Sequence, residues 1–167
     1  MSNGKKKIFL LLSIVVPFML YCFYYYGMMI KNAPYKFSEF DSIVFNYGTG
    51  DSLVNKYNSK TMDYEYLNTR DSLIKGHLKL SKDDLLYLHR KAADLGFWDF
   101  PTNMVNDTSV RKDAKAPHYY IEFKYKRKSK RVLFDAAFEG DPKLIDAAQR
   151  LIKEIQKKID EADKRGK

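Results

Sequence analysis

The chain has 167 residues, of which 31% are charged and 15% aromatic, and its formal net charge is +9. Burial of this much aromatic surface offsets the entropy lost on folding, which excludes an intrinsically disordered chain. The single cysteine, Cys22, excludes an intramolecular disulfide and a metal site built from several cysteines.

The first element is an uncharged run of 23 residues, Ile8 to Ile30. A helix of about 20 residues crosses the hydrocarbon core of a bilayer. Tyrosines at 24–26 fall where such a helix would reach the far interface, a layer that tyrosine favours. Pro17 is tolerated within a span. The run therefore predicts a transmembrane helix over residues 8–30.

Two other fates of this run have less support. A cleavable signal peptide has an apolar region of about 7 to 15 residues followed by a small-x-small site, but Tyr25 stands at the −3 position before Gly27. Lipid attachment to Cys22 needs a small residue directly before the cysteine, and Tyr21 stands there. We expect the run to stay in the mature protein as a signal anchor.

The flanks of the run predict its orientation. Lys5, Lys6 and Lys7 precede it, whereas Lys31 and Lys36 follow it. This lysine bias favours a cytosolic N-terminus and an extracytoplasmic domain, which is periplasmic in a bacterium. The predicted organisation is a basic flank (1–7), the anchor (8–30), a juxtamembrane link (31–40), a globular domain (41–160) and a solvated tail (161–167).

Alternating apolar residues predict the strands of the domain. Ile43, Phe45 and Tyr47 alternate with smaller or polar neighbours, which indicates a strand. The same pattern over 61–67 and 73–80 predicts a hairpin, and the segments 118–126 and 131–136 predict a second one.

Capping residues and apolar stripes predict two helices. Ser81 is a typical N-cap and Gly96 a typical left-handed C-cap, which indicates a helix over 82–95. Asp141 and Pro142 open a second helix. The expected buried positions are Leu85, Leu88, Ala92 and Leu95 in the first and Leu144, Ala148, Leu151, Ile155 and Ile159 in the second. The order hairpin, helix, hairpin, helix predicts a two-layer α+β fold with an antiparallel sheet of four or five strands and both helices on one face.

The segment "LKLSKDDLLYLHRKAADLGFWDFP" is a strand leading into a capped helix that ends in Gly and aromatic residues. With the hairpin and closing helix that follow, it resembles small α+β domains of bacterial envelope and lipoprotein-like sequences of the Bacteroidetes type. The resemblance covers roughly residues 40–160. It implies an α+β fold at the cell envelope and brings no activity with it.

A basic segment, "KYKRKSKR", occupies the tip of the second hairpin. Its six cations are Lys124, Lys126, Arg127, Lys128, Lys130 and Arg131. They can bind an anionic partner such as lipid headgroups or envelope polymers, or they can form a solvated turn whose lysines prevent pairing between strand edges. Nucleic acid is not an expected partner, because Tyr125 alone interleaves with the charges.

The candidate catalytic residues are His118, Asp135 and Glu139, which could act as acid, base or cation ligand if they converge. Alternation places His118 on the polar face of its strand. The other two histidines, His77 and His89, are expected at the surface as well, and no pair has the spacing of a metal site. We expect no cofactor and no metal.

The sequence thus predicts a single-pass membrane protein with an extracytoplasmic domain that binds or scaffolds a partner, such as lipid, an envelope polymer or a membrane protein, without catalysis. One alternative is a membrane-tethered hydrolase or metal-dependent enzyme that uses His118, Asp135 and Glu139. Another is a cytosol-facing basic module that binds anionic lipid.

Overall fold

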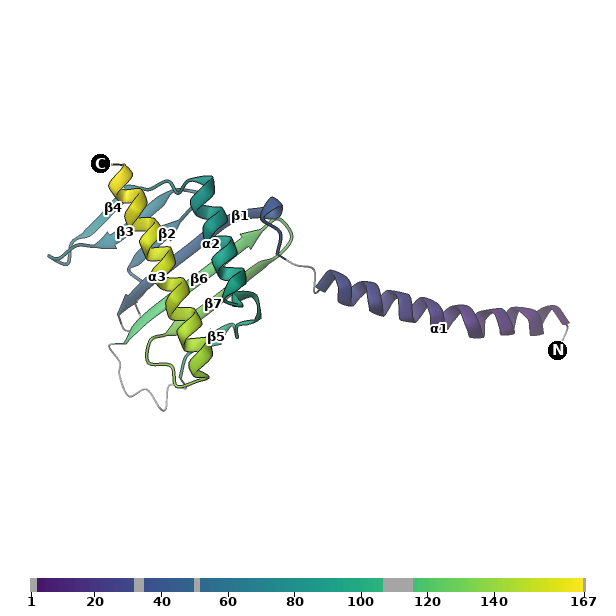
Figure 1. Cartoon of the computed structure of the whole chain (residues 1–167). Helices are drawn as coiled ribbons and strands as arrows, with labels where there is room; N and C mark the ends of the chain where they lie inside the picture. The colour runs from purple at the N-terminus through teal and green to yellow at the C-terminus, as the bar shows by residue number, and fades with distance from the viewer. Residues whose placement is uncertain (1–2, 32–34, 50–51, 107–115, 167) are drawn as a thin grey trace. The chain divides into compact units, whose positions relative to one another are not determined.

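The computed structural model describes residues 3–31, 35–49, 52–106 and 116–166 (Figure 1). The chain divides into two compact units, residues 1–35 and 36–167. Residues 32–34 of the expected link lie outside the described part of the chain.

The first unit is the helix α1 (Asn3–Lys31). Its stretch Gly4–Tyr26 is long and apolar enough to cross a membrane, with a mean hydropathy of 2.2, and none of it is buried. The apolar helix expected from the sequence is therefore confirmed. It also includes the basic residues 5–7, so their side chains project from a continuous helix that contains Pro17.

The second unit contains a sheet of seven strands. They are β1 (Phe40–Thr49), β2 (Asn55–Asn58), β3 (Asp63–Leu67), β4 (Leu73–His77), β5 (Asn103–Met104), β6 (Pro117–Tyr125) and β7 (Ser129–Asp135), in the spatial order β4-β3-β2-β1-β6-β7-β5. Neighbouring strands are antiparallel, except that β5 runs parallel to β7. The long strands β1 and β6 form the centre.

The α+β class is confirmed, but the expected antiparallel sheet of four or five strands is wrong. The sheet is mixed, because β5 joins it in parallel after α2. The sequence did not predict β2 and β5, which have only four and two residues. Strands this short contain too few alternations for the pattern to be recognised.

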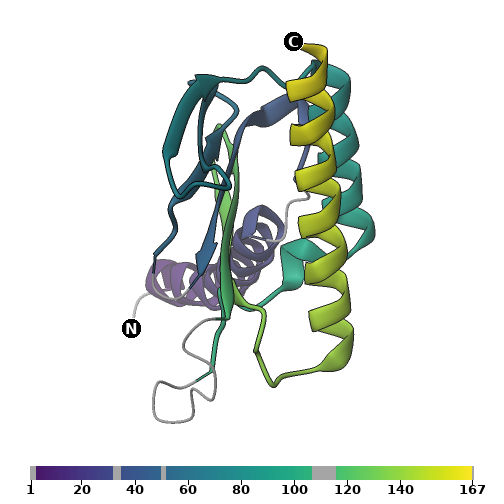
Figure 2. The ribbon, with the colours of Figure 1, turned by 90° about the vertical axis from the view of Figure 1, so that its left-hand side faces the viewer.

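Two helices, α2 (Lys82–Asp94) and α3 (Pro142–Arg165), cover one face of the sheet (Figure 2). Short 3-10 turns, η1 (Phe37–Glu39) and η2 (Phe97–Asp99), precede β1 and follow α2. Gly96 has a φ of 72° between α2 and η2, which agrees with the left-handed C-cap expected there. Residues 161–165, expected in a solvated tail, belong to α3, and Ala162 among them is buried.

The core lies between the sheet and the two helices. Alternate residues of the central strands, such as Ile43, Phe45, Ile121 and Phe123, point into it. The helices contribute Leu88, Ala92, Ala148, Leu151, Ile152, Ile155 and Ile159, all buried. On the opposite face of the sheet, where β6 presents Tyr120, Glu122 and Lys124, the described residues of the second unit form no helix (Figure 2).

Candidate functional site

The β6–β7 hairpin separates the six basic residues of its tip. The strand register pairs Phe123 with Lys130 and Glu122 with Arg131, so Lys130 lies on the helix side of the sheet and Arg131 on the open side. Lys130 donates a hydrogen bond from Nζ to the carbonyl oxygen of Phe100. Burial lowers the pKa of Lys130, and the charge of Asp99 partly opposes this effect. The six cations therefore do not form one surface.

Lys124, on the open face, is already paired within the protein. Its Nζ lies 3.5 Å from Oε2 of Glu122. The same carboxylate oxygen accepts a hydrogen bond of 2.9 Å from the hydroxyl group of Tyr120. Lys124 thus balances a charge on its own strand, which favours the solvated-turn interpretation for this part of the segment.

The tip of the hairpin packs against η1, at the end of the sheet where β1 begins (Figure 1). The backbone N–H of Lys126 donates to the carbonyl oxygen of Glu39 at 2.9 Å. The guanidinium group of Arg127 donates to the carboxylate of Glu39. The turn is thereby joined to the first residues of the second unit by one backbone bond and one ion pair.

Two further cations gather around the same carboxylate. The hydrogen bond from Arg127 lowers the pKa of Glu39 against the opposing effect of desolvation, and the charges of Arg127, Lys36 and Lys128 lower it further. We call this group the Glu39 cluster: Lys36, Glu39, Lys126, Arg127 and Lys128. The cluster contains four cations and one carboxylate, so its net charge is +3.

Aromatic rings support the Glu39 cluster from the domain side. Phe37 of η1 stacks on Phe40 at 5.4 Å between ring centroids and lies 5.5 Å from the ring of His89. Trp98 contacts both His89, at 5.7 Å, and Tyr125, at 5.9 Å. Phe37, Phe40 and Trp98 remain half-buried. The cluster thus rests on a platform of packed rings that is partly open to solvent.

His89 belongs to this platform, so the expectation of a surface histidine is wrong. It is 8% exposed, and its Nδ1 is hydrogen-bonded to the hydroxyl group of Tyr125 at 2.7 Å. Burial lowers the pKa of His89, and the positive charge of Arg90 lowers it further. The sequence showed only that His89 lies off the main apolar stripe of its helix. In the structure, η1 and η2 cover this position.

The structure brings two of the three candidate catalytic residues together. His118 and Asp135 are neighbours on β6 and β7, and their Nε2 and Oδ2 atoms lie 3.8 Å apart. They are 5% and 1% exposed, so His118 is not the solvated residue expected from its polar strand face. Its other cross-strand neighbour is Gly48, and the carbonyl oxygen of Ser52 lies where a side chain on Gly48 would be. Ser52 therefore covers this corner of the open face.

Glu139 lies at the surface beyond the end of β7. Its backbone N–H donates to Oδ1 of Asn106 at 2.9 Å. In the described part of the chain, no three side chains of His, Cys, Asp or Glu gather in a way that could hold a metal ion. Asp135 also accepts a hydrogen bond of 2.8 Å from the backbone N–H of Ala137. The contacts of Asp135 with His118 and with the backbone of Ala137 are typical of residues that hold the end of β7 in place.

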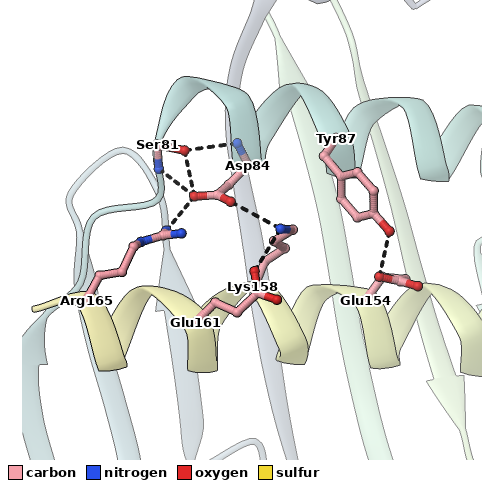
Figure 3. A network of polar contacts seen from close by, with 7 residues as sticks. All are labelled: Ser81, Asp84, Tyr87, Glu154, Lys158, Glu161 and Arg165. Atoms are coloured by element: carbon pink, nitrogen blue, oxygen red, sulfur yellow. Dashed lines mark hydrogen bonds and ion pairs between the residues drawn. The ribbon is translucent and has the colours of Figure 1, made fainter.

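A second polar network links the two helices (Figure 3). Asp84 forms a capping box with Ser81 at the start of α2 and is 5% exposed. Its carboxylate also accepts a hydrogen bond of 2.6 Å from Arg165 and lies 3.4 Å from Nζ of Lys158. Burial alone would raise the pKa of Asp84, but the hydrogen bonds from Ser81 and Arg165 outweigh it and lower the pKa. The contacts of Asp84 with Arg165 and Lys158 therefore join α2 to α3.

Comparison of the chain with protein-family models, curated proteins and solved structures finds no match. The resemblance to bacterial envelope domains stays a prediction from the sequence.

Proposed function

We propose that this chain is a single-pass membrane protein whose second unit lies outside the cytoplasm and binds or scaffolds a partner at the membrane surface without catalysis. The observation that carries the proposal is the helix α1. Its stretch Gly4–Tyr26 has the length and hydropathy of a membrane span, and none of it is buried. A bilayer supplies the apolar surroundings that such a helix needs.

The proposed orientation rests on the lysines that flank the span. Lys5, Lys6 and Lys7 lie on one side, and Lys31 and Lys36 on the other. Basic residues stay preferentially in the cytoplasm, so the bias favours a cytosolic N-terminus. The alternative, a basic module that faces the cytosol, would have the same span in the opposite orientation.

A binding role has more support than an enzymatic one. The closest pair of candidate catalytic groups, His118 and Asp135, is almost completely buried, so a substrate atom has little access to it. Glu139 lies at the surface, where its backbone N–H donates a hydrogen bond to Asn106. The Glu39 cluster, in contrast, presents exposed cations on a supported surface. Surfaces of this kind bind anionic partners.

Reporter enzymes fused to the C-terminus test this proposal in bacterial cells. A phosphatase that is active only outside the cytoplasm should be active in the fusion, and the fusion should stay in the membrane after extraction at high pH. The variant with Lys5, Lys6 and Lys7 changed to Gln should give a mixed orientation, because the lysine bias is then reversed. A fusion released by the extraction, or one active only with a cytoplasmic reporter, contradicts the proposal.

A further inference from the structure

We infer that the Glu39 cluster is a docking surface for anionic lipid headgroups, which fixes the orientation of the second unit on the bilayer. The inference rests on the proposed membrane anchoring and names the partner of that domain. The inference requires that α1 is anchored in a membrane. It holds for either orientation of the span, because both leaflets can carry anionic lipid.

The covalent chain keeps the Glu39 cluster near the span. Lys36, a member of the cluster, comes five residues after Lys31, the last residue of α1. Five extended residues cover at most about 18 Å. The other members are held to the same segment, because Lys126 and Arg127 bond to Glu39. A bilayer that surrounds α1 is therefore the anionic surface within reach of the cluster.

The charge of the cluster fits such a surface. Several exposed cations elsewhere in the domain form one-to-one pairs with acids, as in Lys60–Asp41, Lys75–Glu65 and Arg150–Asp146. The Glu39 cluster combines four cations with one carboxylate. Lys36, Lys126 and Arg127 are exposed. Basic residues next to a membrane are attracted by the negative potential of anionic lipids.

Glu39 positions these cations. Its bond to Arg127 and the backbone bond from Lys126 hold the β6–β7 turn on η1. The half-buried rings of Phe37, Phe40 and Trp98 lie beside the turn. Among these residues, tryptophan is a type that favours the headgroup layer of a bilayer. Cations and aromatic rings at one end of the sheet together form the arrangement that an interfacial contact requires.

Trp98 is the only tryptophan of the chain and lies next to the cluster, so its fluorescence reports on docking. The test uses the full chain in nanodiscs that contain doxyl-labelled lipid, with either zwitterionic lipid alone or a mixture with phosphatidylglycerol. We expect stronger quenching of Trp98 in the anionic discs. The additional quenching should disappear at high salt, because salt screens surface charges.

The decisive variant changes Lys126 and Lys128 to Gln and leaves the Glu39–Arg127 pair intact. Each lysine removed should lower the docking equilibrium constant about fivefold. The matched control changes Lys143 and Lys153, two exposed lysines of α3, to Gln and should keep the wild-type quenching. Thermal unfolding of both variants shows whether the domain remains folded.

Equal quenching of Trp98 in both kinds of disc overturns the inference, as does an equal loss in the control variant. The inference is also overturned if the chain binds soluble polyphosphate while the quenching of Trp98 does not depend on lipid charge, because the partner is then not the bilayer. Failure of the proposed function is seen separately, since a chain without a membrane anchor does not enter the discs at all.

Discussion

The carboxylate of Glu39 accepts a hydrogen bond from the guanidinium group of Arg127, 88 residues further along the chain. This ion pair joins the first turn of the domain to the tip of the β6–β7 hairpin. It explains why a basic turn packs on η1 instead of extending into solvent. The pair is exposed, so it contributes to local order more than to the global stability of the domain.

Changing Arg127 to Gln should loosen the turn. The amide of Lys126, which donates to the carbonyl oxygen of Glu39, should then exchange its hydrogen about two- to fivefold faster. Hydrogen–deuterium exchange of the full chain in detergent measures this rate. The control Arg150→Gln removes an exposed pair on α3 and should leave the Lys126 amide unchanged. An unaltered rate in the Arg127 variant contradicts the role given to the pair.

Changing Asp84 to Asn should destabilise the domain by about 2 kcal/mol. The substitution removes the charge that Arg165 and Lys158 share and weakens the capping box of α2. Urea unfolding of the full chain in detergent, followed by Trp98 fluorescence, measures the change. The control Asp146→Asn breaks only an exposed pair on α3 and should cost about 0.5 kcal/mol or less. Equal losses in the two variants contradict the account.

The effect of Asp84 should depend on pH. Its pKa is lowered in the folded state, so its contribution is complete above the unfolded pKa and is lost as the pH falls through the folded pKa. Wild type and Asp84→Asn should therefore differ most near neutral pH and converge in strong acid. Urea midpoints measured across this range test the sign. A difference that grows on acidification contradicts it.

His89 should make the domain less stable as the pH falls from about 7 to about 5. Burial lowers the pKa of His89 in the folded state below the usual histidine value of 6.5. As the pH falls, the unfolded chain therefore binds a proton at His89 before the folded chain does. The variant His89→Gln should lose this part of the pH dependence in urea unfolding. His77→Gln is the matched control, because His77 is exposed, and it should keep the wild-type slope. The same slope in all three proteins contradicts the prediction.

Gly48→Ala should destabilise the domain by about 2 to 3 kcal/mol. A Cβ atom on Gly48 would lie 1.8 Å from the carbonyl oxygen of Ser52, so the backbone at Gly48 or at Ser52 must move. The control Gly76→Ala adds a Cβ on β4 with no atom within 4 Å. Because alanine is preferred to glycine within a strand, the control should be neutral or stabilising by about 0.5 kcal/mol. Similar unfolding midpoints for the two variants contradict this prediction.

The sequence predicted the elements that have a long periodic pattern. The stripes of α2 and α3, the alternation in β1 and β6, and the apolar run of α1 all extend over several periods. The end of α3 was missed because residues 161–165 are mostly charged, and their place in the helix depends partly on the contact between Arg165 and Asp84. Local patterns do not contain such tertiary partners.

The candidate site was only partly predictable for the same reason. The basic tip was visible in the sequence, but Lys36 and Glu39 joined it through a contact across 88 residues. Alternation assigned His118 to the correct strand face. It could not show that Ser52 lies over the neighbouring Gly48 on that face. A strand pattern predicts the side on which a residue lies, whereas its burial depends on what covers that side.

The most direct test of the central claim is cysteine labelling of the anchored chain. In the background Cys22→Ser, the substitution Ser129→Cys places one thiol at an exposed position of the hairpin. A membrane-impermeant maleimide added to intact spheroplasts should label it, and the labelled chain should sediment with the membranes. Labelling that requires permeabilisation, or a labelled chain in the soluble fraction, would contradict an anchored domain outside the cytoplasm.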